Sequence, residues 1–100
     1  MNTMTAETLL RDIFDAEAAL HWFEQKYGLL SETFYQVYQQ GLLRDEDPDE
    51  IQEYLSWAGS WEIFMDRRQR YNQAIELRRS QLNRPASLLE LHFNQLRVPV

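Results

Sequence analysis

The residues that could hold a metal ion or transfer protons are few in this chain. It has two histidines, His21 and His92, and no cysteine. Glu17 precedes His21 by about one helical turn, so these two side chains could share an ion. Metal sites inside helical bundles, however, take Glu-x-x-His pairs from two helices, and no such pair occurs in the sequence. We therefore interpret His21 as a surface histidine and predict no metal site.

Residue patterns typical of covalent or phosphate chemistry are also missing from the sequence. It contains no thiol, no glycine-rich phosphate loop, no Gly-x-Ser-x-Gly turn and no His-Glu-x-x-His motif. Neighbouring acids such as Glu50 and Glu53 fit a solvated helix face near a helix start better than acid–base catalysis. We predict that the protein is not an enzyme and needs no cofactor.

The charged residues are divided unevenly along the chain, whose net charge is −6. Residues 1–66 hold three basic and fourteen acidic residues (−11), whereas residues 67–100 hold seven arginines and two glutamates (+5). Residues eleven positions apart nearly eclipse each other on a helix, so a basic stripe can form around Tyr71. Its members would be Arg67, Arg68, Arg70, Arg78 and Arg79. Nucleic-acid binding is thus an alternative function, opposed by the acidic remainder and by internal pairing such as Asp66 with Arg70.

Aromatic residues are the strongest indication of a binding function. The chain has thirteen of them, and aromatic and arginine side chains are enriched in the cores of protein interfaces. Within residues 54–64 we expect Tyr54, Ala58 and Trp61, with Met65 beyond them, to pack on the first helix. Trp57 and Phe64 are then the better candidates for a partner. The predicted partner-binding residues are Trp57, Trp61, Phe64, Arg67, Arg68, Tyr71, Arg78, Arg79 and Phe93.

Three helical segments must position these side chains. Apolar residues recur every three or four positions from Ala6 to Tyr27, which predicts a helix over about 5–27 that packs lengthwise on another helix. A short second helix is predicted to start at Ser31 as its N-cap, with Leu30 and Tyr35 as a hydrophobic staple, and to end at Gly41.

The third segment begins with Asp47, Pro48 and Glu50, a pattern typical of a helix start. Its helical pattern runs to about Leu82, and Gly59 indicates a bend or the close approach of another helix. Ser87 and Glu90 form a capping box, which predicts a short last helix with Leu88, Leu89, Phe93 and Leu96 as its apolar residues. Leu89, Leu91 and Phe93 also alternate as in a strand, the alternative for that segment.

The simplest assembly is an all-α antiparallel hairpin of the first and third helices, with the short helix crossing one end. This arrangement places Asp12, Asp15 and Glu17 beside the arginine-rich half of the long helix. We predict one small domain of three to four helices, with a core over residues 1–83 and a tail over residues 84–100. The absence of a long apolar run and of a secretory leader predicts a cytoplasmic protein with no membrane contact.

Part of the sequence resembles a known group of proteins. The resemblance covers about residues 22–80 and rests on KYGLLSETFYQVYQQGLLRDED (26–47), YLSWAGSWEIF (54–64) and the charged helix that follows. This stretch resembles small bacterial and archaeal proteins encoded as one partner of two-gene toxin–antitoxin modules. The matching residues are Tyr27, Gly28, Ser31, Phe34, Tyr35, Gly41, Trp57 and Ala58.

The resemblance implies an antitoxin that neutralises a cognate toxin by binding it, with no catalytic residues of its own. It also implies that operator DNA is contacted only as part of a complex. The predicted partners are therefore a toxin and, in addition, a second copy of the chain. A nucleic-acid-binding regulator and a small scaffold dimer remain the alternatives.

Overall fold

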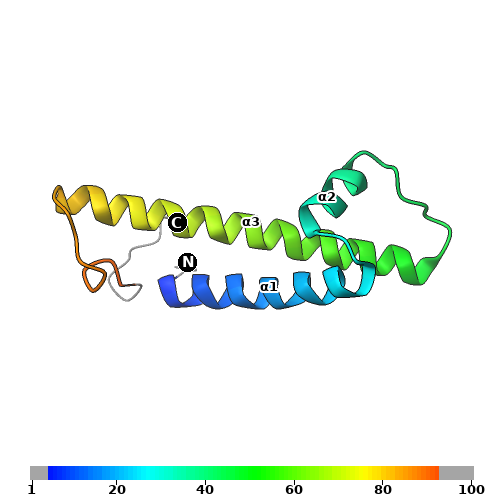
Figure 1. The fold of residues 1–100 in the computed structure, drawn as a ribbon, viewed down its shortest axis with the longest axis horizontal. Helices are drawn as coiled ribbons and strands as arrows, with labels where there is room; N and C mark the ends of the chain where they lie inside the picture. The colour runs from blue at the N-terminus through cyan, green and yellow to red at the C-terminus, as the bar shows by residue number, and fades with distance from the viewer. Residues whose placement is uncertain (1–4, 93–100) are drawn as a thin grey trace.

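Three helices make up most of residues 5–92, which are the residues that the computed structural model describes (Figure 1). They are α1 (Ala6–Tyr27), α2 (Ser31–Gln39) and α3 (Pro48–Leu82). No strand occurs in this range. The predicted all-α class is confirmed, and the three helices of the described residues fall within the predicted number of three to four.

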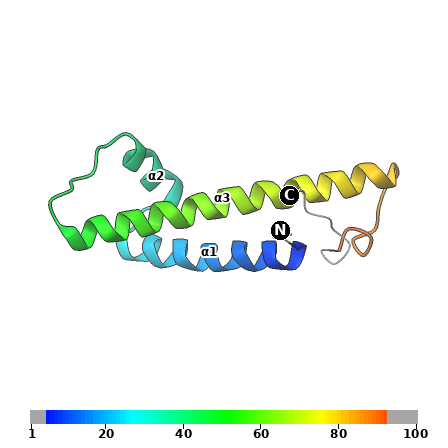
Figure 2. The same ribbon diagram turned by 180° about the vertical axis from the view of Figure 1, so that it is seen from behind.

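α1 and α3 lie side by side along their length and run antiparallel (Figures 1 and 2). At one end Leu9 packs against Ala74, and at the other the ring of Phe23 stacks on Trp57 with centroids 5.4 Å apart. α3 has 35 residues and α1 has 22, and α3 extends past α1 at both ends (Figures 1 and 2). The predicted hairpin is therefore the framework of the fold, and α2 lies across one end of it.

The apolar seam of α1 is the one that its spacing predicts. Its buried residues recur at intervals of three and four, as in helices that pack lengthwise. They are Ala6, Leu9, Ile13, Ala16, Leu20 and Phe23. The helix boundaries also agree with the prediction: the hydroxyl of Thr5 accepts a hydrogen bond from the amide of Thr8 at 3.0 Å, and Gly28 ends the helix at φ +64°. That left-handed conformation strains any residue with a side chain.

The start of α2 differs from the prediction. Its N-cap is Leu30, which makes no side-chain capping bond, and Ser31 is already the first helical residue. Leu30 is 70% exposed, so no staple with Tyr35 forms. The amide of Ser31 instead donates to the carboxylate of Glu24 at 2.9 Å. A side chain from the end of α1 therefore caps α2, which local spacing does not reveal.

α3 starts as predicted, because the carboxylate of Asp47 accepts from the amides of Asp49 and Glu50 and Pro48 takes the first position. The helix then continues without interruption through Gly59. A Cβ added at that glycine would meet no atom within 4 Å. The predicted close approach at Gly59 is therefore absent, and the helix is not broken there.

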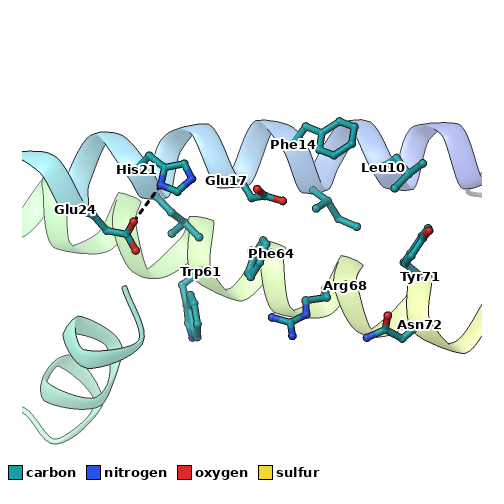
Figure 3. Close-up of a pocket in the computed structure, with 12 residues that line it drawn as sticks. Leu10, Phe14, Glu17, His21, Glu24, Trp61, Phe64, Arg68, Tyr71 and Asn72 are labelled. Carbon is teal, nitrogen blue, oxygen red and sulfur yellow. Dashed lines mark hydrogen bonds and ion pairs between the residues drawn. The ribbon is translucent and has the colours of Figure 1, made fainter. Parts of the chain in front are cut away.

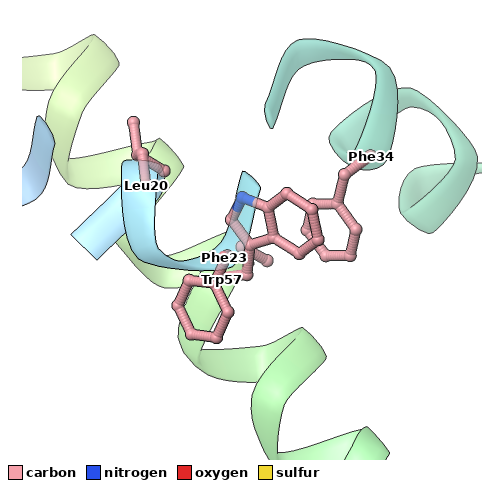
Figure 4. Packing of buried hydrophobic residues seen from close by; sticks show 5 residues of the cluster. Leu20, Phe23, Phe34 and Trp57 are labelled. Carbon is pink, nitrogen blue, oxygen red and sulfur yellow. The ribbon is translucent and has the colours of Figure 1, made fainter. Parts of the chain in front are cut away.

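Trp57 lies at the centre of the core where the three helices meet, and it is only 1% exposed (Figure 4). Phe34 of α2 stacks on its indole ring with centroids 3.9 Å apart and planes 2° apart. Met65, predicted to be core, is 44% exposed. The expectation that Trp57 contacts a partner while Met65 packs inside is therefore wrong. The physical reason is that α2 packs over the Trp57 side of α3.

After α3, Asn83 adopts φ 51° and the chain turns back. The predicted capping box forms: the amide of Ser87 donates to the Glu90 carboxylate at 3.1 Å and the amide of Glu90 donates to the Ser87 hydroxyl at 3.3 Å. Within the described residues it supports a single turn rather than a longer helix. Phe93 and Leu96, assigned to that helix, lie outside the described residues.

Candidate protein-interaction groove

An apolar groove of about 640 Å³ runs between α1 and α3 (Figure 3). All of its lining residues come from these two helices. Those from α1 are Leu10, Ile13, Phe14, Glu17, Leu20, His21 and Glu24, and those from α3 are Trp61, Phe64, Arg68, Tyr71 and Asn72. From Leu10 to Glu24 the groove follows fifteen residues of α1, and the fourteen helical rises between them give a length of about 21 Å.

Phe14 is the most exposed apolar side chain of the groove. It is 62% exposed, although it belongs to the helix whose seam forms the core. A two-helix hairpin covers only one stripe of each helix, and α2 reaches only the end near Trp57. The part of the groove farther from Trp57, which includes Phe14, is therefore left without a covering element among the described residues.

Two opposite charges line the groove without an ion-pair partner in the described part of the chain. Glu17 of α1 has no salt bridge there, and Arg68 of α3 lies with its guanidinium 5.8 Å from the centroid of the Phe64 ring. This position allows a cation–π contact, which leaves the guanidinium donors available. The groove thus combines an apolar floor with one available anion and one available cation.

The other charged groups along the groove are held by neighbours. His21 interacts with Glu24 at 3.2 Å, and Glu24 accepts the amide and the hydroxyl of Ser31. Partial burial raises the pKa of Glu24, but these hydrogen bonds and the nearby His21 outweigh it, so that the pKa lies below its ordinary value. Glu24 is therefore a structural carboxylate at one end of the groove.

The same serine connects the groove to the core. Its hydroxyl donates to Glu24 at 2.8 Å and accepts the indole N–H of Trp57 at 2.8 Å. Ser31 is 1% exposed. The network joins α1, the start of α2 and α3, and so fixes the angle at which the three elements meet.

The structure brings together four of the nine predicted partner-binding residues. Trp61, Phe64, Arg68 and Tyr71 all line the groove. Trp57 is buried in the core, and Phe93 lies beyond the described range. Sequence reasoning missed the contribution of α1, above all Phe14, although its place beside the predicted seam was visible in the spacing.

The remaining predicted arginines contact other groups of the chain. Arg67 pairs with Asp12 at 3.0 Å and with Asp66, Arg79 pairs with Glu76, and Arg78 donates to the backbone oxygen of Glu90 at 3.1 Å. The predicted Asp66–Arg70 pair also forms, at 3.0 Å. These contacts do not favour a free basic stripe for phosphate binding.

Within residues 5–92, no three histidine, aspartate or glutamate side chains come together in a way that could hold a metal ion. None of the helices described there has the length and apolar character needed to cross a membrane. The lining of the groove is mainly apolar, and its charged side chains are Glu17, Glu24 and Arg68.

Comparison with known proteins finds no matching family model, no matching curated protein and no matching solved structure. The relation to antitoxins therefore depends on the sequence pattern alone and stays a prediction.

Proposed function

We propose that the protein is a non-enzymatic interaction module whose groove between α1 and α3 receives a helix of a partner protein. The observation that carries this proposal is the open apolar groove with an available Glu17 on one helix and an available Arg68 on the other. Amphipathic helices bind grooves of this kind through apolar side chains spaced three and four residues apart.

The length and charges of the groove define the partner. About 21 Å corresponds to roughly four turns of a helix. The partner helix would place apolar side chains on the floor formed by Leu10, Phe64 and Tyr71, a basic side chain near Glu17 and an acidic one near Arg68. Each charge pair at the edge would add specificity and faster association more than affinity.

We further propose that this partner is a cognate toxin and that binding neutralises it in the cytoplasm. Two features support this role: the antitoxin-like pattern of residues 22–80 and the charge of −11 over residues 1–66. An acidic protein is attracted to the basic substrate surface of a toxin that cleaves RNA or transfers nucleotides, and steering by opposite charge speeds their encounter.

Coexpression with the product of the neighbouring gene tests this function. We expect that product to stop growth when expressed alone, and this protein to restore growth and to purify with it. The groove variant Phe14→Glu should lose both effects. The matched control is Leu55→Glu, which also changes a half-exposed apolar residue (52%) but lies outside the groove.

Two results would reject the antitoxin role: a neighbouring product that is harmless alone, or toxicity that persists without complex formation when the wild-type protein is present. Neutralisation that Phe14→Glu leaves intact would reject the groove as the binding site. Circular dichroism of each variant checks that its helices are retained.

A further inference from the structure

We propose that, in the absence of another partner, the groove is occupied by a second copy of this chain, in a four-helix bundle with two-fold symmetry. The inference rests on the proposed function in one respect, because it assigns an occupant to the same groove. It concerns the isolated protein, however, and can be tested without any toxin.

The small size of the core supports a second copy. The buried apolar side chains in the described residues number ten, and α3 contributes only Trp57, Ala58 and Ala74 to them. A chain of 100 residues is near the lower limit at which one core is self-sufficient. Two hairpins packed groove to groove would cover Phe14 and the partly buried rings of Phe64 and Tyr71.

The position of the charges selects one arrangement of the two copies. Phe23 stacks on Trp57 and Asp12 pairs with Arg67, so Arg68 lies about level with Asp12 along the hairpin. Glu17 is about five residues farther along α1, and Phe14 lies near the midpoint. The side chains of Glu17 and Arg68 are therefore placed almost evenly about Phe14.

We place the two-fold axis between the two copies, perpendicular to both helices and at the level of Phe14. It sets α1 antiparallel to α1 of the second copy and α3 antiparallel to its counterpart, as in four-helix bundles with short loops. Phe14 meets its own copy at the axis. Each Arg68 comes to the level of Glu17 in the other chain, so each of these side chains gains a partner of opposite charge.

Sedimentation of the isolated 100-residue chain tests the arrangement. We expect the wild type to be dimeric at micromolar concentration and Phe14→Glu to be monomeric, because it places two carboxylates at the axis. Glu17→Arg and Arg68→Glu should each raise the dissociation constant by roughly tenfold or more, because each creates two like-charge contacts. Glu32→Arg and Arg11→Glu, which make the same charge changes outside the groove, should leave it near the wild-type value.

Mixing the two groove variants gives the decisive result. In a heterodimer of Glu17→Arg with Arg68→Glu, both pairs join opposite charges again, whereas neither homodimer has one. We expect the mixture to form a heterodimer with nearly wild-type affinity. A wild-type monomer at about 100 µM, or a mixture that associates no better than its components, would overturn the proposed dimer. A dimer that fails to neutralise a toxin rejects only the antitoxin role, and neutralisation by a protein that stays monomeric rejects only the dimer.

Discussion

Replacement of Ser31 by alanine should destabilise the protein because it breaks the network that joins the three helices. The hydroxyl accepts the indole N–H of Trp57 at 2.8 Å and donates to Glu24 at 2.8 Å. Both Ser31 and Trp57 are 1% exposed, so water has little access to the donor that remains.

The two losses differ in size. A buried N–H without an acceptor costs about 1–3 kcal/mol. The hydrogen bond lost by Glu24 costs less than is usual for a charged group, because the carboxylate is 21% exposed and retains the amide of Ser31. We expect Ser31→Ala to lower the free energy of unfolding by roughly 2–4 kcal/mol. This is a large share of the roughly 5–15 kcal/mol typical of a chain of this length.

Urea unfolding followed by circular dichroism measures the change, and a double-mutant cycle isolates its origin. In the Trp57→Phe background no indole N–H is left unpaired, so Ser31→Ala should cost about 1–3 kcal/mol less there than in the wild type. Ser56→Ala, an exposed serine of α3, is the control and should change stability by no more than about 0.5 kcal/mol. An equal cost of Ser31→Ala in both backgrounds would refute the role assigned to this hydrogen bond.

Two further substitutions test other features of the fold. Gly59→Ala should stabilise the protein by roughly 0.5–1 kcal/mol in the same assay, because α3 is continuous there and the new methyl group meets no atom within 4 Å; destabilisation would show that a close contact does exist. Glu24→Gln should cost about 1 kcal/mol at neutral pH, because a charged acceptor is replaced by a neutral one. The pKa of Glu24 is lower in the folded protein than in the unfolded chain, so this cost is fully present above the unfolded pKa and is lost as the pH falls through the folded one. A difference from the wild type that does not shrink between pH 6 and pH 3 would contradict this assignment.

The sequence by itself determined the helices and their pairing. The spacing of apolar residues from Ala6 to Phe23 identifies the seam of α1, and Thr5, Gly28, Asp47 and Pro48 mark helix ends through local contacts. Such features lie within a few residues of one another along the chain, so local sequence is enough to predict them. The opposite charges of the two helices also predicted an antiparallel hairpin, and the Asp12–Arg67 pair agrees with it.

Only the tertiary structure decided which side of α3 is buried. Apolar residues occur on several sides of this helix, including the exposed Leu55, Ile63 and Met65, so periodicity alone does not single out a core stripe. The docking of α2 selects the side that carries Trp57, and Ser31 supplies the acceptor that allows its indole N–H to be buried. The same choice leaves Phe14 and Arg68 along an uncovered groove. Residues distant in the sequence meet there, and for that reason the candidate site emerges only from the packing of the helices.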